Sequence, residues 1–166
     1  MPPLPDYARE YLLSALEGAP DVIAALLTDL PAGDAALWDR RPDPERFTLR
    51  EIAAHLADWD VIYRERLERT RDEDNPFLPD VDEGRVALDR DYARSDARES
   101  LTRFARNRAA VVALLRALPA DAWTRPAEKE GVGTLTVEAQ VTLICAHDGH
   151  HARQVVAWLR PPETGR

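Results

Sequence analysis

All four histidines of this chain lie in two short segments. His55 stands in EIAAHLADWD, and His147, His150 and His151 stand in AHDGHHARQ. Imidazole is the commonest protein ligand of transition metals, and the i, i+4 spacing of His147 and His151 puts both rings on one side of a helix. With His55 from a distant helix as a third ligand, the set would leave a fourth coordination position open. That arrangement is typical of catalytic rather than structural zinc-type sites.

The apolar pattern around these histidines indicates which of them face inward. In the last helical segment, apolar residues mark the buried stripe at Val137, Val141, Ile144, Val155 and Trp158. At about 100° per residue, His151 falls within this stripe, His147 lies on its flank, and His150 and Cys145 point to other sides. His55 flanks a second stripe, formed by Ile52, Leu56 and Trp59. The pattern predicts His55, His147 and His151 as metal ligands, and the alternative is ordinary hydrogen-bonded histidines on helix flanks.

Several neighbours of these histidines are candidates for roles in a site. Glu51 and Asp58 share one helical row with His55, so either carboxylate could orient that ring or act as a base on a metal-bound water. The alternative is a solvated helix edge with arginine partners. Gln154 follows His151 by about one helical turn and is expected to line the site. Trp59 is either a core anchor or a wall of a substrate pocket.

Arg108 falls in the middle of an apolar stripe, between Phe104 and the pair Val111 and Val112. A buried guanidinium must be paired with an acidic group or bind an anion. Two interpretations follow: a structural ion pair, or a clamp for a substrate carboxylate.

The pattern along the chain is helical throughout, and no stretch shows strand alternation bounded by turns. Thr48 to Glu51 forms a Thr-x-x-Glu capping box, and Ser95 and either Thr134 or Thr136 are expected N-caps of later helices. The expected long helices cover about 6–30, with a kink or break near Pro20, then 49–74, 95–118 and 136–160. A long acidic connection, 72–94, is expected to cross one end of the bundle and to hold a short helix at about 83–92. The sequence therefore predicts an all-α protein, a single four-helix-bundle domain over residues 1–166 with a crossover between its second and third helices.

Charge and composition exclude several classes of partner. The net charge of −8 disfavours nucleic acid and anionic membranes as partners, because both need a basic footprint. The single cysteine, Cys145, allows no intrachain disulfide and fits a reduced, cytoplasmic setting. The first residues, MPPLPDYARE, lack the features of a signal peptide, and no apolar run approaches the ~18 residues of a spanning helix.

Two segments of the chain resemble a known family. FTLREIAAHLADWDVIYRERL and AHDGHHARQVVAWL resemble the two histidine motifs of the DinB/YfiT-like superfamily, and the resemblance extends from about residue 10 to 160. Phe47 stands where that family often has Trp. The resemblance implies a four-helix bundle, frequently a homodimer, with one metal ion held by His55, His147 and His151.

The family also suggests what such a site does. Relatives include transferases and isomerases that use low-molecular-weight thiols such as mycothiol or bacillithiol, and others that look like metal-dependent hydrolases. We therefore expect Zn²⁺ or Ni²⁺ as cofactor, a thiol cosubstrate and a small-molecule substrate. The leading hypothesis is thiol S-transfer. The alternatives are hydrolysis by a metal-bound water, and a non-enzymatic, stress-associated bundle in which a metal only braces the helices.

Overall fold

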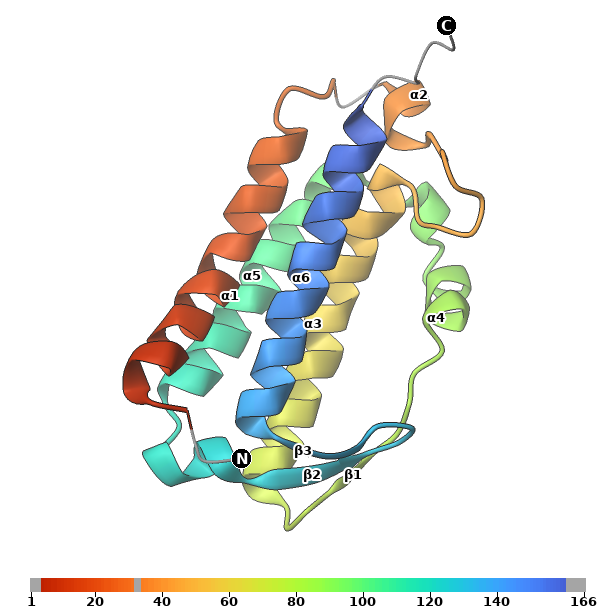
Figure 1. Ribbon diagram of the computed structural model, residues 1–166. Helices are drawn as coiled ribbons and strands as arrows, with labels where there is room; N and C mark the ends of the chain where they lie inside the picture. Colours follow the sequence, from red (N-terminus) through yellow and green to blue (C-terminus); the bar gives the residue numbers. More distant parts are fainter. Residues whose placement is uncertain (1–3, 32–33, 161–166) are drawn as a thin grey trace, which may run out of the picture.

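Four long helices run side by side and form the body of the molecule (Figure 1). The computed structural model describes residues 4–31 and 34–160. The four helices are α1 (Asp6–Leu27), α3 (Leu49–Asp72), α5 (Ala97–Arg116) and α6 (Val137–Leu159). This architecture confirms the predicted all-α class and four-helix bundle, while the outermost residues of the predicted domain 1–166 lie outside the described part.

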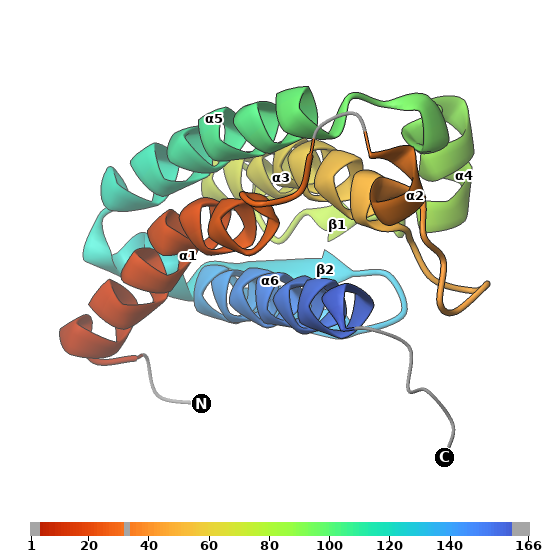
Figure 2. The ribbon, with the colours of Figure 1, turned by 90° about the horizontal axis from the view of Figure 1, so that it is seen from above.

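Each bundle helix packs against two others. Seen along the bundle, α1 contacts α5 and α6, and α3 contacts the same two helices (Figure 2). The helix that carries His55, α3, is therefore a direct neighbour of α6, which carries His147 and His151. This arrangement allows histidines that lie 92 residues apart in the sequence to meet.

Local side-chain chemistry sets where the helices begin. The predicted capping box of α3 is present: the Thr48 hydroxyl accepts a hydrogen bond from the Glu51 N–H at 3.2 Å, and the Glu51 carboxylate accepts one from the Thr48 N–H at 2.8 Å. Thr136 caps α6. The prediction of Ser95 as the cap of α5 is wrong by one residue. The Asp96 carboxylate accepts the capping bond, whereas the Ser95 hydroxyl donates to the Tyr92 carbonyl and closes the preceding turn.

Helix α1 differs from expectation around its proline. It runs without a break through Pro20 and ends at Leu27, so of the two predicted alternatives, a kink or a break near Pro20, the break is wrong. Proline removes one intrahelical hydrogen bond, but Leu16, Ile23 and Leu27 are buried on the inner face on both sides of it. Burial of this continuous stripe outweighs the local loss.

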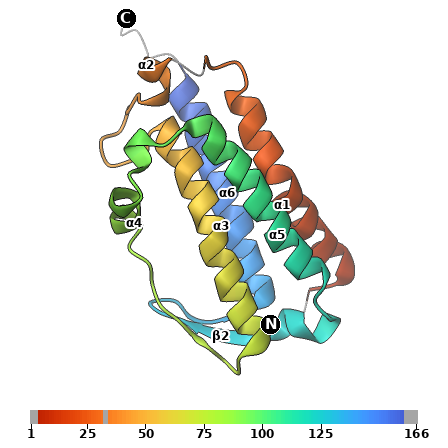
Figure 3. The same cartoon turned by 180° about the vertical axis from the view of Figure 1, so that it is seen from behind.

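The predicted long crossover between α3 and α5 is confirmed, but its predicted path over one end of the bundle is wrong, because it runs along the outside of α3 (Figure 3). It contains a short helix, α4 (Glu83–Asp89), and a 3-10 turn, η1 (Tyr92–Arg94). Two further short elements are α2 (Ala35–Trp38), before α3, and η2 (Ala120–Thr124), after α5. Helix α4 has no fully buried residue, so the crossover is anchored by Leu78 before it and Tyr92 after it.

A small sheet closes the end of the bundle near the start of α6, and the sequence analysis missed it (Figure 1). Its strands are β1 (Phe77–Leu78), β2 (Pro126–Lys129) and β3 (Gly133–Thr136), in the order β1-β2-β3. β1 pairs parallel with β2, and β2 pairs antiparallel with β3. Strands of two to four residues are too short to show the alternation that predicts a strand.

The core consists of two apolar clusters separated by a polar layer. One cluster includes Ile23, Ile52 and Phe104, and the other includes Leu16, Leu67 and Val141. The polar layer between them contains buried charged side chains of α3, α5 and α6: Asp60, Arg108 and Asp148. Within the described residues, no helix is both long and apolar enough to cross a membrane.

Candidate metal centre

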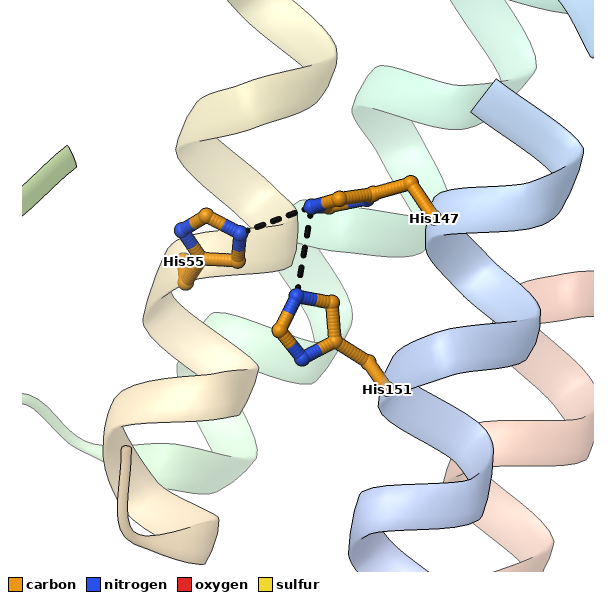
Figure 4. Close-up of side chains that lie close together, drawn as sticks. All are labelled: His55, His147 and His151. Carbon is orange, nitrogen blue, oxygen red and sulfur yellow. Dashed lines mark hydrogen bonds between the residues drawn. The ribbon is translucent and has the colours of Figure 1, made fainter. Parts of the chain in front are cut away.

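The imidazoles of His55, His147 and His151 converge between α3 and α6 (Figure 4). Their Nε2 atoms face one another: His55 Nε2 lies 2.9 Å from His147 Nε2, which lies 3.2 Å from His151 Nε2. All three ligand atoms lie within 4.8 Å of one another. The structure therefore brings together the three residues that the helical pattern selected.

The spacing of these nitrogen atoms fits a small divalent ion. Zinc–imidazole bonds of about 2.0–2.1 Å in a tetrahedral shell place neighbouring nitrogen atoms about 3.3 Å apart. The two contacts of 2.9 and 3.2 Å are close to this value, and the third pair of ligand atoms, from His55 and His151, lies within 4.8 Å, so the rings would have to adjust their separations to hold an ion. Three imidazoles would supply three of the four ligands of such an ion, which would leave one position for an exchangeable group.

Gln154 determines which nitrogen of His151 faces this centre. The Gln154 side-chain amide donates to the Phe47 carbonyl at 3.1 Å, so its oxygen is turned toward His151 Nδ1, 3.2 Å away. Since an amide oxygen only accepts, His151 carries its proton on Nδ1 and directs a lone pair from Nε2 into the cluster. Gln154 was predicted to line the site, and the structure places it there as the partner of His151.

Glu83 approaches the outer nitrogen of His55, and the sequence analysis missed it. Its Oε1 lies 3.5 Å from His55 Nδ1, a buried atom that makes no hydrogen bond; His147 Nδ1 is also buried without a partner. A carboxylate next to the imidazole nitrogen that does not bind the metal commonly orients a metal-binding histidine. A short helix was predicted at about 83–92, but the path of the crossover decides that Glu83 reaches His55 on α3.

Burial keeps the three rings neutral. Desolvation, reinforced by the neighbouring imidazoles, lowers the pKa of His55 to about 2 and that of His147 to about 3. Burial, followed by the charge of His150, lowers the pKa of His151 to about 4. Neutral imidazoles present the lone pairs that a metal requires, so this cluster is ready to bind an ion at neutral pH.

These pKa shifts predict that the metal-free protein loses stability in mild acid. Between about pH 6.5 and 4 the unfolded chain takes up protons on His55, His147 and His151 that the folded chain excludes. The free energy of unfolding should therefore fall as the pH falls, by up to roughly 1.4 kcal/mol per pH unit for each imidazole. Asp60, Asp148 and Glu83 act in the opposite sense and reduce this slope, because burial raises the pKa of each carboxyl, that of Asp60 to about 6.

Urea denaturation of the metal-free protein at pH 7.5, 6 and 5 measures this dependence. A variant with all three histidines replaced by Gln is the control and should lose most of the slope. An equal slope in both proteins would show that other groups cause it.

Glu51 and Asp58 make their contacts with arginines rather than with the imidazoles. The Glu51 carboxylate is held by Arg41 through two hydrogen bonds of 2.7 and 2.8 Å, in addition to its role in the capping box. Asp58 pairs with Arg103 of α5. The arginine partners match the alternative interpretation, although Glu51 is buried rather than solvated, and neither carboxylate contacts an imidazole of the cluster.

Trp59 and Cys145 take different places relative to the cluster. The Trp59 ring stacks on His55 with ring centroids 4.5 Å apart, so it walls one side of the cluster as well as packing in the bundle. Cys145 points instead toward α1, with its Sγ 3.7 Å from the Leu12 carbonyl oxygen.

Arg108 is buried and fully paired. Its guanidinium makes two hydrogen bonds to Asp60, two to Asp148 and one to the Leu16 carbonyl. These five contacts use all five N–H groups of an arginine side chain. Burial opposes the charged form, but the two carboxylates outweigh it and raise the pKa of Arg108. The structure therefore shows the ion pair and leaves no donor for the substrate-carboxylate clamp.

A pocket of ≈470 Å³ opens beside the cluster. Its volume is in the range of small-molecule sites. It is lined by the loop before α3, the start of α4 and one face of α6: Glu45, Arg46, Phe47, Glu83, Gly84, His147, His150, His151 and Gln154. Two of the three converging imidazoles therefore form part of its wall.

A four-helix bundle with three converging histidines beside an open pocket defines a class of candidate metal-binding proteins. The family model of the DinB superfamily matches residues 15–155, and the chain belongs to this superfamily. Among solved structures, the fold is similar to YfiT from Bacillus subtilis, with a TM-score of 0.86 and 19% sequence identity over 95% of this chain and 89% of that one. YfiT is described as a probable metal-dependent hydrolase with an unusual four-helix bundle topology. A search of curated proteins finds no match.

Proposed function

We propose that this protein is a metal-dependent enzyme that activates a low-molecular-weight thiol for S-transfer to a small electrophile. The observation that carries the proposal is the convergence of three Nε2 atoms, from His55, His147 and His151, beside an open pocket. A Zn²⁺ or Ni²⁺ ion held there supplies Lewis acidity that lowers the pKa of a thiol or a water at its open position.

The arrangement of the pocket supports a thiol that comes from a cosubstrate. Cys145 is the only cysteine of the chain, and its Sγ faces α1 rather than the pocket. Burial also raises the pKa of its thiol to about 11, which disfavours a thiolate. A sulfur nucleophile must therefore enter as a small molecule, for which the pocket has sufficient volume.

Two residues of the pocket prepare it for this chemistry. Gln154 fixes the His151 tautomer, so that Nε2 remains free to bind a metal. Glu83 lies in the pocket wall within 3.5 Å of His55 Nδ1, where it can orient the ring or accept the proton released by an incoming thiol. Burial raises the pKa of Glu83, which suits a group that must take up a proton.

Hydrolysis is the second candidate, favoured by the description of YfiT as a probable metal-dependent hydrolase. The same Glu83 carboxylate could accept a proton from water instead of from a thiol. A purely structural metal is less well supported, because structural sites close all four ligand positions with protein atoms. Here three protein ligands converge next to a pocket.

Thiol dependence separates the two enzymatic candidates. We expect Zn²⁺- or Ni²⁺-loaded protein to accelerate the reaction of a small thiol with electrophiles such as monobromobimane above its spontaneous rate, and to leave ester and amide substrates intact. Cys145→Ser should behave as wild type, because this side chain lies outside the pocket. Hydrolysis without thiol would favour the second candidate, and no turnover in either assay would contradict both.

A further inference from the structure

Arg46 differs from the other arginines around the start of α3 in how it is paired. Arg41 binds the Glu51 carboxylate at 2.7 Å, and Arg50 binds Asp39 at 2.6 Å. Within residues 4–31 and 34–160, the ion pair found for Arg46 is with Asp43, 3.7 Å from its Nε and beyond hydrogen-bond range. Its guanidinium therefore keeps donors free, and it lies in the wall of the pocket.

His150 holds this guanidinium at the pocket. Arg46 Nη1 lies 3.2 Å from His150 Nε2, and both side chains line the pocket together with His147 and His151. The rings of His150 and His151 are 5.2 Å apart, centroid to centroid. A short ligand can consequently reach the Nε2 cluster with one end and the free donors of Arg46 with the other.

The acidic residues of the pocket do not neutralise Arg46. Glu45 and Glu83 also line the pocket, but neither forms an ion pair with Arg46 within 4.0 Å. A fork of free N–H groups matches the geometry of a carboxylate, which arginine binds through two parallel hydrogen bonds. A bound divalent cation nearby would further favour an anionic ligand.

We propose that Arg46, held by His150, is a carboxylate-binding subsite, and that the ligand of this centre carries a carboxylate a few bonds from the group that meets the metal. The inference rests on the proposed metal centre and narrows its ligands to small acids, such as thiol acids. The helical pattern had separated His150 from the metal ligands because it faces away from the core. Its exposed position is what gives it a role at the rim.

A matched pair of chelators tests the subsite independently of the reaction that the enzyme performs. Succinic monohydroxamate and its amide share a hydroxamate that binds divalent metals and differ only in the terminal carboxylate. We expect calorimetric titration of the Zn²⁺-loaded wild type to show roughly five- to tenfold tighter binding of the acid, as for a partly exposed charge-assisted contact. Arg46→Gln should remove this preference while zinc content stays unchanged.

Arg153→Gln is the control, because it makes the same change in net charge on an exposed side chain outside this pocket. It should keep the preference for the acid, and circular dichroism should show that both variants are folded.

Two results would overturn the subsite without contradicting the metal centre. One is equal binding of acid and amide by the zinc-loaded wild type, and the other is an equal loss of preference in both variants. A protein that binds neither Zn²⁺ nor Ni²⁺ would refute the proposed function and the subsite together. Binding of the acid without any thiol-dependent turnover would refute S-transfer and support the subsite.

Discussion

Replacing His55, His147 or His151 with Ala should each lower the affinity for Zn²⁺ or Ni²⁺ by at least about 100-fold. Each substitution removes one of three converging ligands, and even the loss of an outer partner of a metal ligand commonly costs 10- to 100-fold. Metal content measured by mass spectrometry after dialysis should fall from about one ion per chain to a small fraction.

His150→Ala is the matched control, since it removes a histidine from the same helix that does not join the cluster. Its metal content should remain close to that of the wild type. Loss of metal in His150→Ala with retention in His151→Ala would contradict the assignment of the ligands.

Arg108→Ala should lower the free energy of unfolding by about 3–5 kcal/mol, the cost of removing one partner from a buried ion pair. The substitution leaves the buried carboxylates of Asp60 and Asp148 without their counter-ion and opens a cavity between the two apolar clusters. Arg108→Leu should cost less, because it refills part of that space. Chemical denaturation of both variants measures the difference.

Arg108→Leu also tests whether this residue serves only the fold. Since all five of its donors are used within the bundle, the Leu variant should retain its metal and the KM of any thiol-dependent activity. The Leu variant still leaves two buried carboxylates unpaired. Combining it with Asp60→Asn and Asp148→Asn removes these two charges and should recover part of the lost stability. A loss below about 1 kcal/mol in Arg108→Ala would contradict the importance of the ion-pair network.

The convergence of the three histidines could be predicted from sequence because their placement depends on helical periodicity. His147 and His151 lie one turn apart beside an apolar stripe, and His55 lies beside another, so both faces had to point inward. Arg108 was predictable for the same reason, since its place in an apolar stripe required burial and pairing. The capping box at Thr48 and Glu51 is likewise a local signal.

Contacts that depend on the path of a loop could not be predicted. Glu83 reaches His55 from the crossover, and Arg46 reaches His150 from the loop before α3, and no periodic pattern encodes either approach. Position in a helical row was also insufficient, because Glu51 and Asp58 share a row with His55 but turn to arginines of other segments. The homodimer implied by the family resemblance stays a prediction.

X-ray absorption spectroscopy of the metal-loaded protein tests the central claim most directly. For Zn²⁺, we expect three imidazole nitrogen neighbours at about 2.0–2.1 Å and one further ligand that exchanges when a small thiol is added. Addition of the thiol should replace that ligand with a sulfur at about 2.3 Å. A shell of four protein ligands that does not change with thiol, or protein that takes up no stoichiometric metal, would contradict a catalytic centre at His55, His147 and His151.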